Sequence, residues 1–245
     1  MVDAIFEQPR LAALYDPLDP DRQDLDAYVA FAQARTARSA LDVGCGTGTL
    51  ACRLARRGLE VVALDPAHAM LEVAMHKASA ERVRWLLGDV TVLRTLPRLS
   101  VDLVTMTGNV AQVFLTDEDW STALRCMYMV LAEDGRLVFE TRDPSDQAWL
   151  HWNRSDTFRR IRVSGIGDVD AWEEVTDVSG DFVSFRSTFV FDGGSEWLVS
   201  ESTLRFRDRK ELAVGLQSAG LHLEEIRDAP DRLGREFVCV ARRME

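Results

Sequence analysis

The sequence predicts an α/β protein with a doubly wound, mostly parallel sheet of seven strands and a small antiparallel β insert. Short apolar runs alternate with segments of helical periodicity up to residue 141, which is typical of parallel βαβ units. A glycine-rich turn, residues 44–48, joins the first of these runs directly to a helix. From about residue 146 to 206 apolar and polar residues alternate instead, which indicates antiparallel strands.

Composition limits the class of protein. A chain of 245 residues suits one domain with an elaboration, and its net charge of −11 disfavours a nucleic-acid substrate. Its four cysteines lack the spacing of a CxxC motif and indicate reduced thiols. Because we find neither a basic leader nor a run of about eighteen apolar residues, we expect a soluble, cytoplasmic protein without a membrane partner. The sequence does not determine the oligomeric state.

Residues 1–39 are predicted to form an N-terminal helical lid. Two prolines and two aspartates make a turn over residues 15–20, and a helix follows from Gln23 to about Arg35. Tyr15 precedes this helix and is a candidate to cover a bound nucleoside or contact the substrate. The alternative is a half-buried tyrosine that packs against the helix.

Five strands follow in the predicted core, and four of them end in polar residues or glycine. These strands are residues 40–43, 59–65, 83–89, 101–107 and 136–141. The carboxyl ends of parallel strands meet at one edge of an open α/β sheet, where ligands bind. A helix beginning at Thr116 carries apolar residues at helical spacing up to Leu131, and Asp134-Gly135 is predicted to end it.

The antiparallel insert is assigned to residues 146–206 and is expected to lie over the active site, because it leaves the sheet from the end of the fifth strand. A hairpin of residues 182–191 and 196–204 is its clearest part, turning at residues 192–195. The core, residues 40–145, resumes at 207–245 with a helix capped by Asp208 and two final strands, expected to be antiparallel.

The residues around the glycine turn distinguish between cofactors. Asp42, Gly44, Gly46 and Gly48 alternate, but Thr49 stands where the dinucleotide fingerprint needs its third glycine, which disfavours a hydride-transfer enzyme. An acid follows about twenty residues later, and Gly88-Asp89 ends the third strand. This order resembles the class I S-adenosylmethionine-dependent methyltransferases over residues 41–143.

The resemblance implies a Rossmann-like methyltransferase with S-adenosyl-L-methionine as cofactor and assigns roles along the chain. Asp42 and the turn from Gly44 through Cys45 and Gly46 to Gly48 would face the methionine moiety. Asp65 would accept the ribose hydroxyls. The adenine would lie against Pro66 and Met70, with Asp89 and Val90 at its amine, while Thr107 and Asn109 would face the methyl group.

The catalytic group and the acceptor are less determined. His151 is the candidate general base, with an exposed loop histidine as the alternative. Candidate substrate-binding residues are Tyr15, Asn109, Trp149 and Trp152. For each tryptophan the alternative, filling the core of a small sheet, is favoured. No histidine pair has metal-ligand spacing, so we expect no metal. Methylation of a small molecule at nitrogen or oxygen is the main hypothesis. The alternatives are a protein or nucleic-acid methyltransferase and a non-catalytic S-adenosylmethionine-binding sensor.

Overall fold

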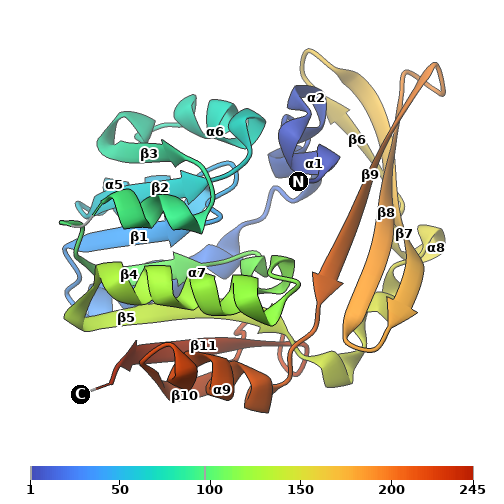
Figure 1. Ribbon diagram of the computed structural model, residues 1–245. Helices are drawn as coiled ribbons and strands as arrows, with labels where there is room; N and C mark the ends of the chain where they lie inside the picture. The colour runs from blue at the N-terminus through green and yellow to red at the C-terminus, as the bar shows by residue number, and fades with distance from the viewer. Residues whose placement is uncertain (1, 97, 245) are drawn as a thin grey trace.

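The computed structural model describes residues 2–96 and 98–244, and within these residues seven strands form the main sheet (Figure 1). The strands are β1 (Ser39–Val43), β2 (Glu60–Asp65), β3 (Val83–Leu87), β4 (Val101–Met106), β5 (Leu131–Arg142), β10 (Leu221–Asp228) and β11 (Glu236–Arg243). Their order across the sheet is β10-β11-β5-β4-β1-β2-β3. Strands β1 to β5 run parallel, and β11 is antiparallel to both β5 and β10. The predicted doubly wound sheet with an antiparallel last pair is confirmed.

Helices cover both faces of this sheet, as Figure 1 shows. The main helices are α4 (Asp26–Ala34), α5 (Thr49–Arg56), α6 (His68–Met75), α7 (Asp117–Val130) and α9 (Arg209–Ser218). Helices α4 and α5 bury their apolar residues in a cluster on one face, whereas α7 and α9 pack on the other around Trp120 and Leu216. Burial of these apolar faces is the main stabilising term of such a layered fold.

The boundary between α7 and β5 differs from the prediction. The helix ends at Val130, and Leu131 already pairs with Val101 of β4, whereas Leu103 pairs with Arg136. The residues between these two pairs form an irregularity within β5, so Asp134-Gly135 lies inside the strand and does not end the helix. A buried Leu131 suits either element, because apolar spacing does not distinguish a last helical turn from a buried strand.

Short helices occur before the first strand, in the connections of the main sheet, and between the main sheet and the second sheet. They are α1 (Ala4–Glu7), α2 (Pro9–Ala12), α3 (Tyr15–Leu18), η1 (Gln23–Leu25), η2 (Ala80–Arg82), η3 (Val90–Thr95), η4 (Val110–Val113), η5 (Pro144–Asp146), η6 (Ala148–His151) and α8 (Arg154–Thr157). Figure 1 shows α1 and α2 between α6 and the second sheet. Leu11 and Leu14 pack on that sheet, while Ala12 packs on Met70 of α6.

In the described residues the second sheet has four antiparallel strands in the order β6-β7-β8-β9. They are β6 (Arg159–Val163), β7 (Gly167–Ser179), β8 (Phe182–Phe191) and β9 (Glu196–Arg205). The predicted hairpin is confirmed, with Phe191 opposite Glu196 beside the turn. Within residues 2–96 and 98–244, no helix is both long and apolar enough to cross a bilayer.

Candidate active site

The three glycines of the turn between β1 and α5 differ in how closely other atoms approach them. Gly44, Gly46 and Gly48 all have a positive φ, +67°, +53° and +73° respectively, which residues with a side chain disfavour. A β-carbon at Gly44 would lie 2.6 Å from Val110, and one at Gly48 would lie 2.4 Å from the Trp85 ring. A β-carbon at Gly46 would meet no atom within 4 Å. Gly44 and Gly48 therefore permit close packing, whereas Gly46 borders open space.

Asp65, at the end of β2, ties the glycine turn to the start of α6. Its Oδ2 accepts a hydrogen bond from Gly46 N and its Oδ1 accepts one from Ala67 N, each at 2.8 Å. Burial raises the pKa of this carboxyl, and the two backbone hydrogen bonds oppose the rise. A carboxylate has about four acceptor positions, so these two bonds leave room for a ligand with two hydroxyl groups.

A cavity of about 1030 Å³ extends from the glycine turn to the second sheet. Eight of the twelve residues that the resemblance assigns to the cofactor line it: Gly44, Gly46, Asp65, Pro66, Met70, Asp89, Val90 and Thr107. Tyr15 lines it too. The far wall comes from β7, β8 and β9, including Thr176, Ser184, Phe185, Arg186, Glu201 and Ser202. The edge of the main sheet predicted to bind the cofactor and the antiparallel insert therefore line the same cavity.

The other four assigned residues do not line the cavity. Asp42 is 1% exposed, and its Oδ1 accepts a hydrogen bond from Thr105 Oγ1 at 2.7 Å. Burial, opposed by this bond, raises the pKa of Asp42 to about 7. Cys45 is half-buried, and Gly48 is the residue before α5. Asn109 is buried, and its side-chain amide donates to Glu236.

The charges at the cavity suit S-adenosylmethionine better than a nucleotide with phosphates. Among the described lining residues the basic one is Arg186, whose Nη2 lies 2.7 Å from Glu201 Oε1. Asp65 and Asp89 are at the end where the adenosine would lie, and the open side of Gly46 leaves room for the methionine moiety. A sulfonium and a ribose diol need acceptors and no cationic partner, so these residues fit the cofactor.

A second hollow of about 620 Å³ lies at the opposite edge of the sheet. It is lined by Asp102 near the start of β4 and by Arg136 within β5, among others. Open α/β sheets bind their ligands at the carboxyl ends of the strands, so we place the site in the larger cavity.

His151 does not line the larger cavity. Its side chain is 75% exposed at the end of η6, and its Nδ1 lies 3.5 Å from Asp156 Oδ2. The imidazole is therefore a surface group, and its candidacy as a base for this cavity is not supported by its position. The 3₁₀ turn that ends at His151 sets the direction in which its side chain points, and sequence spacing does not reveal that direction.

Trp149 and Trp152 also do not line the cavity. The Trp149 ring packs edge-on against Phe206 at 4.7 Å between centroids, and the Trp152 ring packs against Phe185 at 4.9 Å. Phe185 itself lines the cavity, so Trp152 supports its wall from behind. The tryptophans fill a small aromatic core, which is the alternative that the sequence left open.

Tyr15 is held at the cavity by hydrogen bonds of its neighbour Asp16. Asp16 Oδ1 accepts from Thr47 Oγ1 at 2.6 Å, and Asp16 Oδ2 lies 2.6 Å from Lys77 Nζ. Lys77 also donates to Thr49 Oγ1 at 2.6 Å. These bonds attach α3 directly to the glycine turn. Burial raises the pKa of Tyr15, so its hydroxyl stays protonated at neutral pH.

Thr91 and Val110 are among the cavity residues that were missed from the sequence. Thr91 lines the cavity, and its backbone N–H donates to Asp89 Oδ1 at 2.8 Å in a cap of η3. An aspartate followed two residues later by threonine is a recognisable local signal for such a turn. Val110 lines the cavity against Gly44, a contact between distant chain segments that no local pattern reveals.

The fold and the cavity define a Rossmann-like methyltransferase, and comparisons with known proteins agree. The profile of a family described as "Methyltransferase domain" matches residues 40–135. Malonyl-[acyl-carrier protein] O-methyltransferase of Serratia marcescens is 31% identical over 221 residues, which are 89% of this chain and 78% of that protein. The chain belongs to the class I S-adenosylmethionine-dependent methyltransferases, and its cofactor is S-adenosylmethionine.

Solved structures show the same fold over nearly the whole chain. An S-adenosylmethionine-dependent methyltransferase from Clostridium acetobutylicum superposes with a TM-score of 0.78 at 18% identity, covering 96% of this chain and 98% of that one. An S-adenosylmethionine-bound amino pentose methyltransferase from Micromonospora echinaspora gives 0.67 at 24% identity, covering 91% of each. The chain spans only 42–49% of the length of several other curated methyltransferases that it matches.

Proposed function

We propose that this enzyme methylates a nitrogen or oxygen atom of a small-molecule acceptor. The observation that carries the proposal is the enclosure of the cavity from two sides. The N-terminal segment contributes Val2, Phe6 and Tyr15, and the second sheet contributes the wall opposite. A space of about 1030 Å³ closed in this way suits the cofactor together with one small acceptor.

The charges that line the cavity disfavour a nucleic-acid acceptor. A phosphate backbone is bound by several unpaired basic groups, whereas Arg186 is engaged with Glu201. Acidic residues outnumber basic ones in the described lining, namely Asp3, Asp65, Asp89, Asp119, Asp177 and Glu201 against Arg186. A neutral or cationic acceptor is therefore favoured over an anionic one.

Positioning is the main task of the chain's own residues. The bound cofactor supplies a methyl group on a sulfonium, which is a reactive donor without further activation. Holding a nucleophile in line and excluding water contributes up to about 7–11 kcal/mol in favourable cases. The protonated Tyr15 hydroxyl can donate a hydrogen bond to the acceptor, and an amine that enters unprotonated needs no base.

The relatives suggest which acceptors to test. The Micromonospora enzyme acts on an amino pentose and the Serratia enzyme on a malonyl group carried by a protein. A panel of amino sugars, other amines, alcohols and carboxylic acids is incubated with the cofactor, and formation of S-adenosylhomocysteine is measured. Short peptides, a carrier protein and RNA are tested as acceptors in the same assay.

The Asp65→Ala variant serves as the control without donor binding. We expect turnover with at least one small molecule, and none with Asp65→Ala. Turnover with macromolecules alone would overturn the proposal.

A further inference from the structure

The loop after β4, residues 107–110, forms the wall of the cavity next to the glycine turn. Thr107, Gly108 and Val110 line the cavity, and Val110 packs directly on Gly44. Gly108 and Asn109 have φ values of +68° and +62°, so the backbone is left-handed at two successive residues. Asparagine adopts this conformation more readily than most residues with a side chain, and glycine adopts it freely, so residues 108 and 109 suit this backbone.

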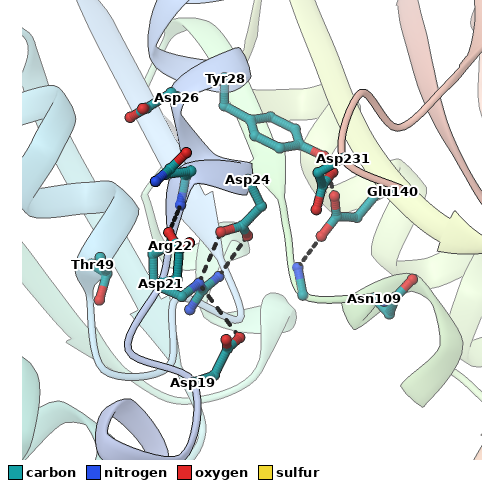
Figure 2. Close-up of polar contacts among 12 residues, drawn as sticks. Asp19, Asp21, Arg22, Asp24, Asp26, Tyr28, Thr49, Asn109, Glu140 and Asp231 are labelled. Carbon is teal, nitrogen blue, oxygen red and sulfur yellow. Dashed lines mark hydrogen bonds and ion pairs between the residues drawn. The ribbon is translucent and has the colours of Figure 1, made fainter. Parts of the chain in front are cut away.

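Two buried carboxylates hold this loop on the side of the sheet. Glu140, near the end of β5, is 1% exposed; its Oε1 accepts from Gly108 N at 2.6 Å and its Oε2 accepts from the Tyr28 hydroxyl of α4 (Figure 2). Glu236, at the start of β11, is 5% exposed and accepts from Asn109 Nδ2 at 3.2 Å. Each of the two left-handed residues is therefore bound by its own carboxylate.

Arg232, in the turn between β10 and β11, joins the two carboxylates. Its Nη1 lies 3.1 Å from Glu236 Oε1, and its Nη2 lies 3.9 Å from Glu140 Oε2. Burial raises the pKa of Glu140, which the Tyr28 hydrogen bond and Arg232 oppose. Burial alone would lower the pKa of Arg232, but Glu236 and Glu140 raise it. We call Glu140, Glu236 and Arg232 the loop clamp.

The loop clamp reduces the stability of the fold compared with apolar packing at the same place. Asn109 Oδ1 and Glu236 Oε2 are buried and have no hydrogen-bond partner in the described residues. Unsatisfied buried acceptors reduce stability, and apolar side chains of similar size would hold these elements at a lower desolvation cost. An apolar side chain, however, cannot accept from the Gly108 N–H. The arrangement is therefore better suited to fixing the loop than to stabilising the core.

Fixing the Gly108 N–H has a consequence for the cavity. The described peptide bonds are all trans, so the N–H of Gly108 and the C=O of Thr107 point in opposite directions. The hydrogen bond to Glu140 therefore keeps the Thr107 carbonyl on the side of the peptide away from Glu140. Rotation of this peptide would change which polar group the loop presents beside the donor.

We propose that Glu140 and Arg232 are positioning residues for methyl transfer, acting by holding residues 107–110 against the donor end of the cavity. The proposal rests on methyl transfer taking place in this cavity and not on the identity of the acceptor. It gives the turn between β10 and β11 a role in the reaction, although within the described residues Arg232 does not line the cavity.

The test compares Glu140→Gln and Arg232→Gln with the parent enzyme. Glu140→Gln removes the charge and leaves one accepting oxygen for two donors, the Gly108 N–H and the Tyr28 hydroxyl, and Arg232→Gln removes the cation. Weakening a hydrogen bond to a charged group in this way predicts a fall in kcat of about 10- to 100-fold. The affinity for S-adenosylhomocysteine, measured by calorimetry, should stay within about threefold of the parent, because the adenosine end does not touch the loop clamp. A role limited to stability would instead lower kcat and affinity together with the melting temperature.

Glu224→Gln is the matched control. Glu224 of β10 is also a carboxylate bound by arginine, with Arg136 Nη2 at 3.0 Å from its Oε1, but it does not contact the loop. Its kcat should equal that of the parent. If Glu140→Gln fails to fold, Arg232→Gln decides, because Arg232 lies in a partly exposed turn and its replacement leaves both carboxylates in place.

A second measurement separates this proposal from the acceptor proposal. Hydrogen exchange of a peptide covering residues 106–113 should be slowed by S-adenosylhomocysteine in the parent and in Glu224→Gln, but much less in Glu140→Gln. This outcome would support the loop clamp even if no small molecule were methylated. Parent-like exchange and parent-like kcat in both clamp variants would overturn it.

Discussion

Replacing Asp42 by asparagine removes a carboxyl group that the fold keeps uncharged up to about pH 7. Asp42 is buried beside Thr105, and burial raises its pKa from 3.8 to about 7. Between these values the folded protein binds more protons than the unfolded chain, so stability falls as pH rises from about 4 to 7. The difference corresponds to about 4 kcal/mol in full, of which about 2–3 kcal/mol lies between pH 5 and pH 8.

The asparagine side chain keeps the shape and the oxygen that accepts from Thr105, but it does not titrate. The stability of Asp42→Asn relative to the parent should therefore increase by about 2–3 kcal/mol from pH 5 to pH 8. Asp65 and Glu140 also have raised pKa values, but they are present in both proteins and cancel in the comparison. Urea unfolding of both proteins without ligand at the two pH values measures this difference.

Ligand binding should oppose the gain in stability that Asp42→Asn has over the parent at pH 8. Asp42 does not line the cavity, but the resemblance assigns it to the methionine moiety, which carries a cationic α-ammonium group. If the Asp42 carboxylate attracts that group, S-adenosylhomocysteine should stabilise the parent more than Asp42→Asn at pH 8. A difference in unfolding free energy that is the same at pH 5 and pH 8 would refute the reasoning from burial. An unchanged stabilisation by the ligand would refute the role of Asp42 in binding.

Four further predictions concern residues assigned to the site. Gly48→Ala should lose about 1–3 kcal/mol of unfolding free energy, since its β-carbon would meet Trp85 at 2.4 Å. Gly46→Ala should lose only about 1 kcal/mol, from its positive φ, but should weaken binding of S-adenosylhomocysteine about tenfold or more because its methyl group would enter the cavity. Asp65→Asn should weaken the same binding about 10- to 100-fold in calorimetry. His151→Ala should keep kcat within about twofold of the parent, because its imidazole is exposed and is not part of the described lining.

Each of these variants has a clear contrary result. Equal stability of Gly48→Ala and the parent would contradict the packing against Trp85. Parent-like affinity of Gly46→Ala or Asp65→Asn would mean that the cofactor does not lie at the turn. A large fall in kcat for His151→Ala, with unchanged stability, would restore that histidine as a candidate base.

Much of the fold follows from local patterns along the chain. Each βα unit is built from neighbouring residues, and parallel strands place their carboxyl ends on one edge, so the order of Asp42, Asp65 and Asp89 predicts a common site. Asp65 and Asp89 do line the cavity. The capping box of Asp208 with Glu211 likewise begins α9 as predicted, because capping depends on residues three positions apart.

Predictions that depended on side-chain direction were less successful. His151, Trp149 and Trp152 follow β5 closely in the sequence, yet none of them lines the cavity. Their direction is set by two short 3₁₀ turns and by packing against Phe206 and Phe185. Proximity along the chain specifies no direction outside regular elements.

The sequence by itself determined the class of fold and the glycine turn, since both are encoded in short-range spacing, and its resemblance to the class I S-adenosylmethionine-dependent methyltransferases implied the cofactor. Only the tertiary structure decided which polar residues face the cavity and which support it from behind. Tyr28 and Glu140 are 112 residues apart, and their hydrogen bond exists because α4 packs over the end of β5. Contacts of this kind depend on how complete elements pack together, and they hold the loop of residues 107–110 at the wall of the cavity.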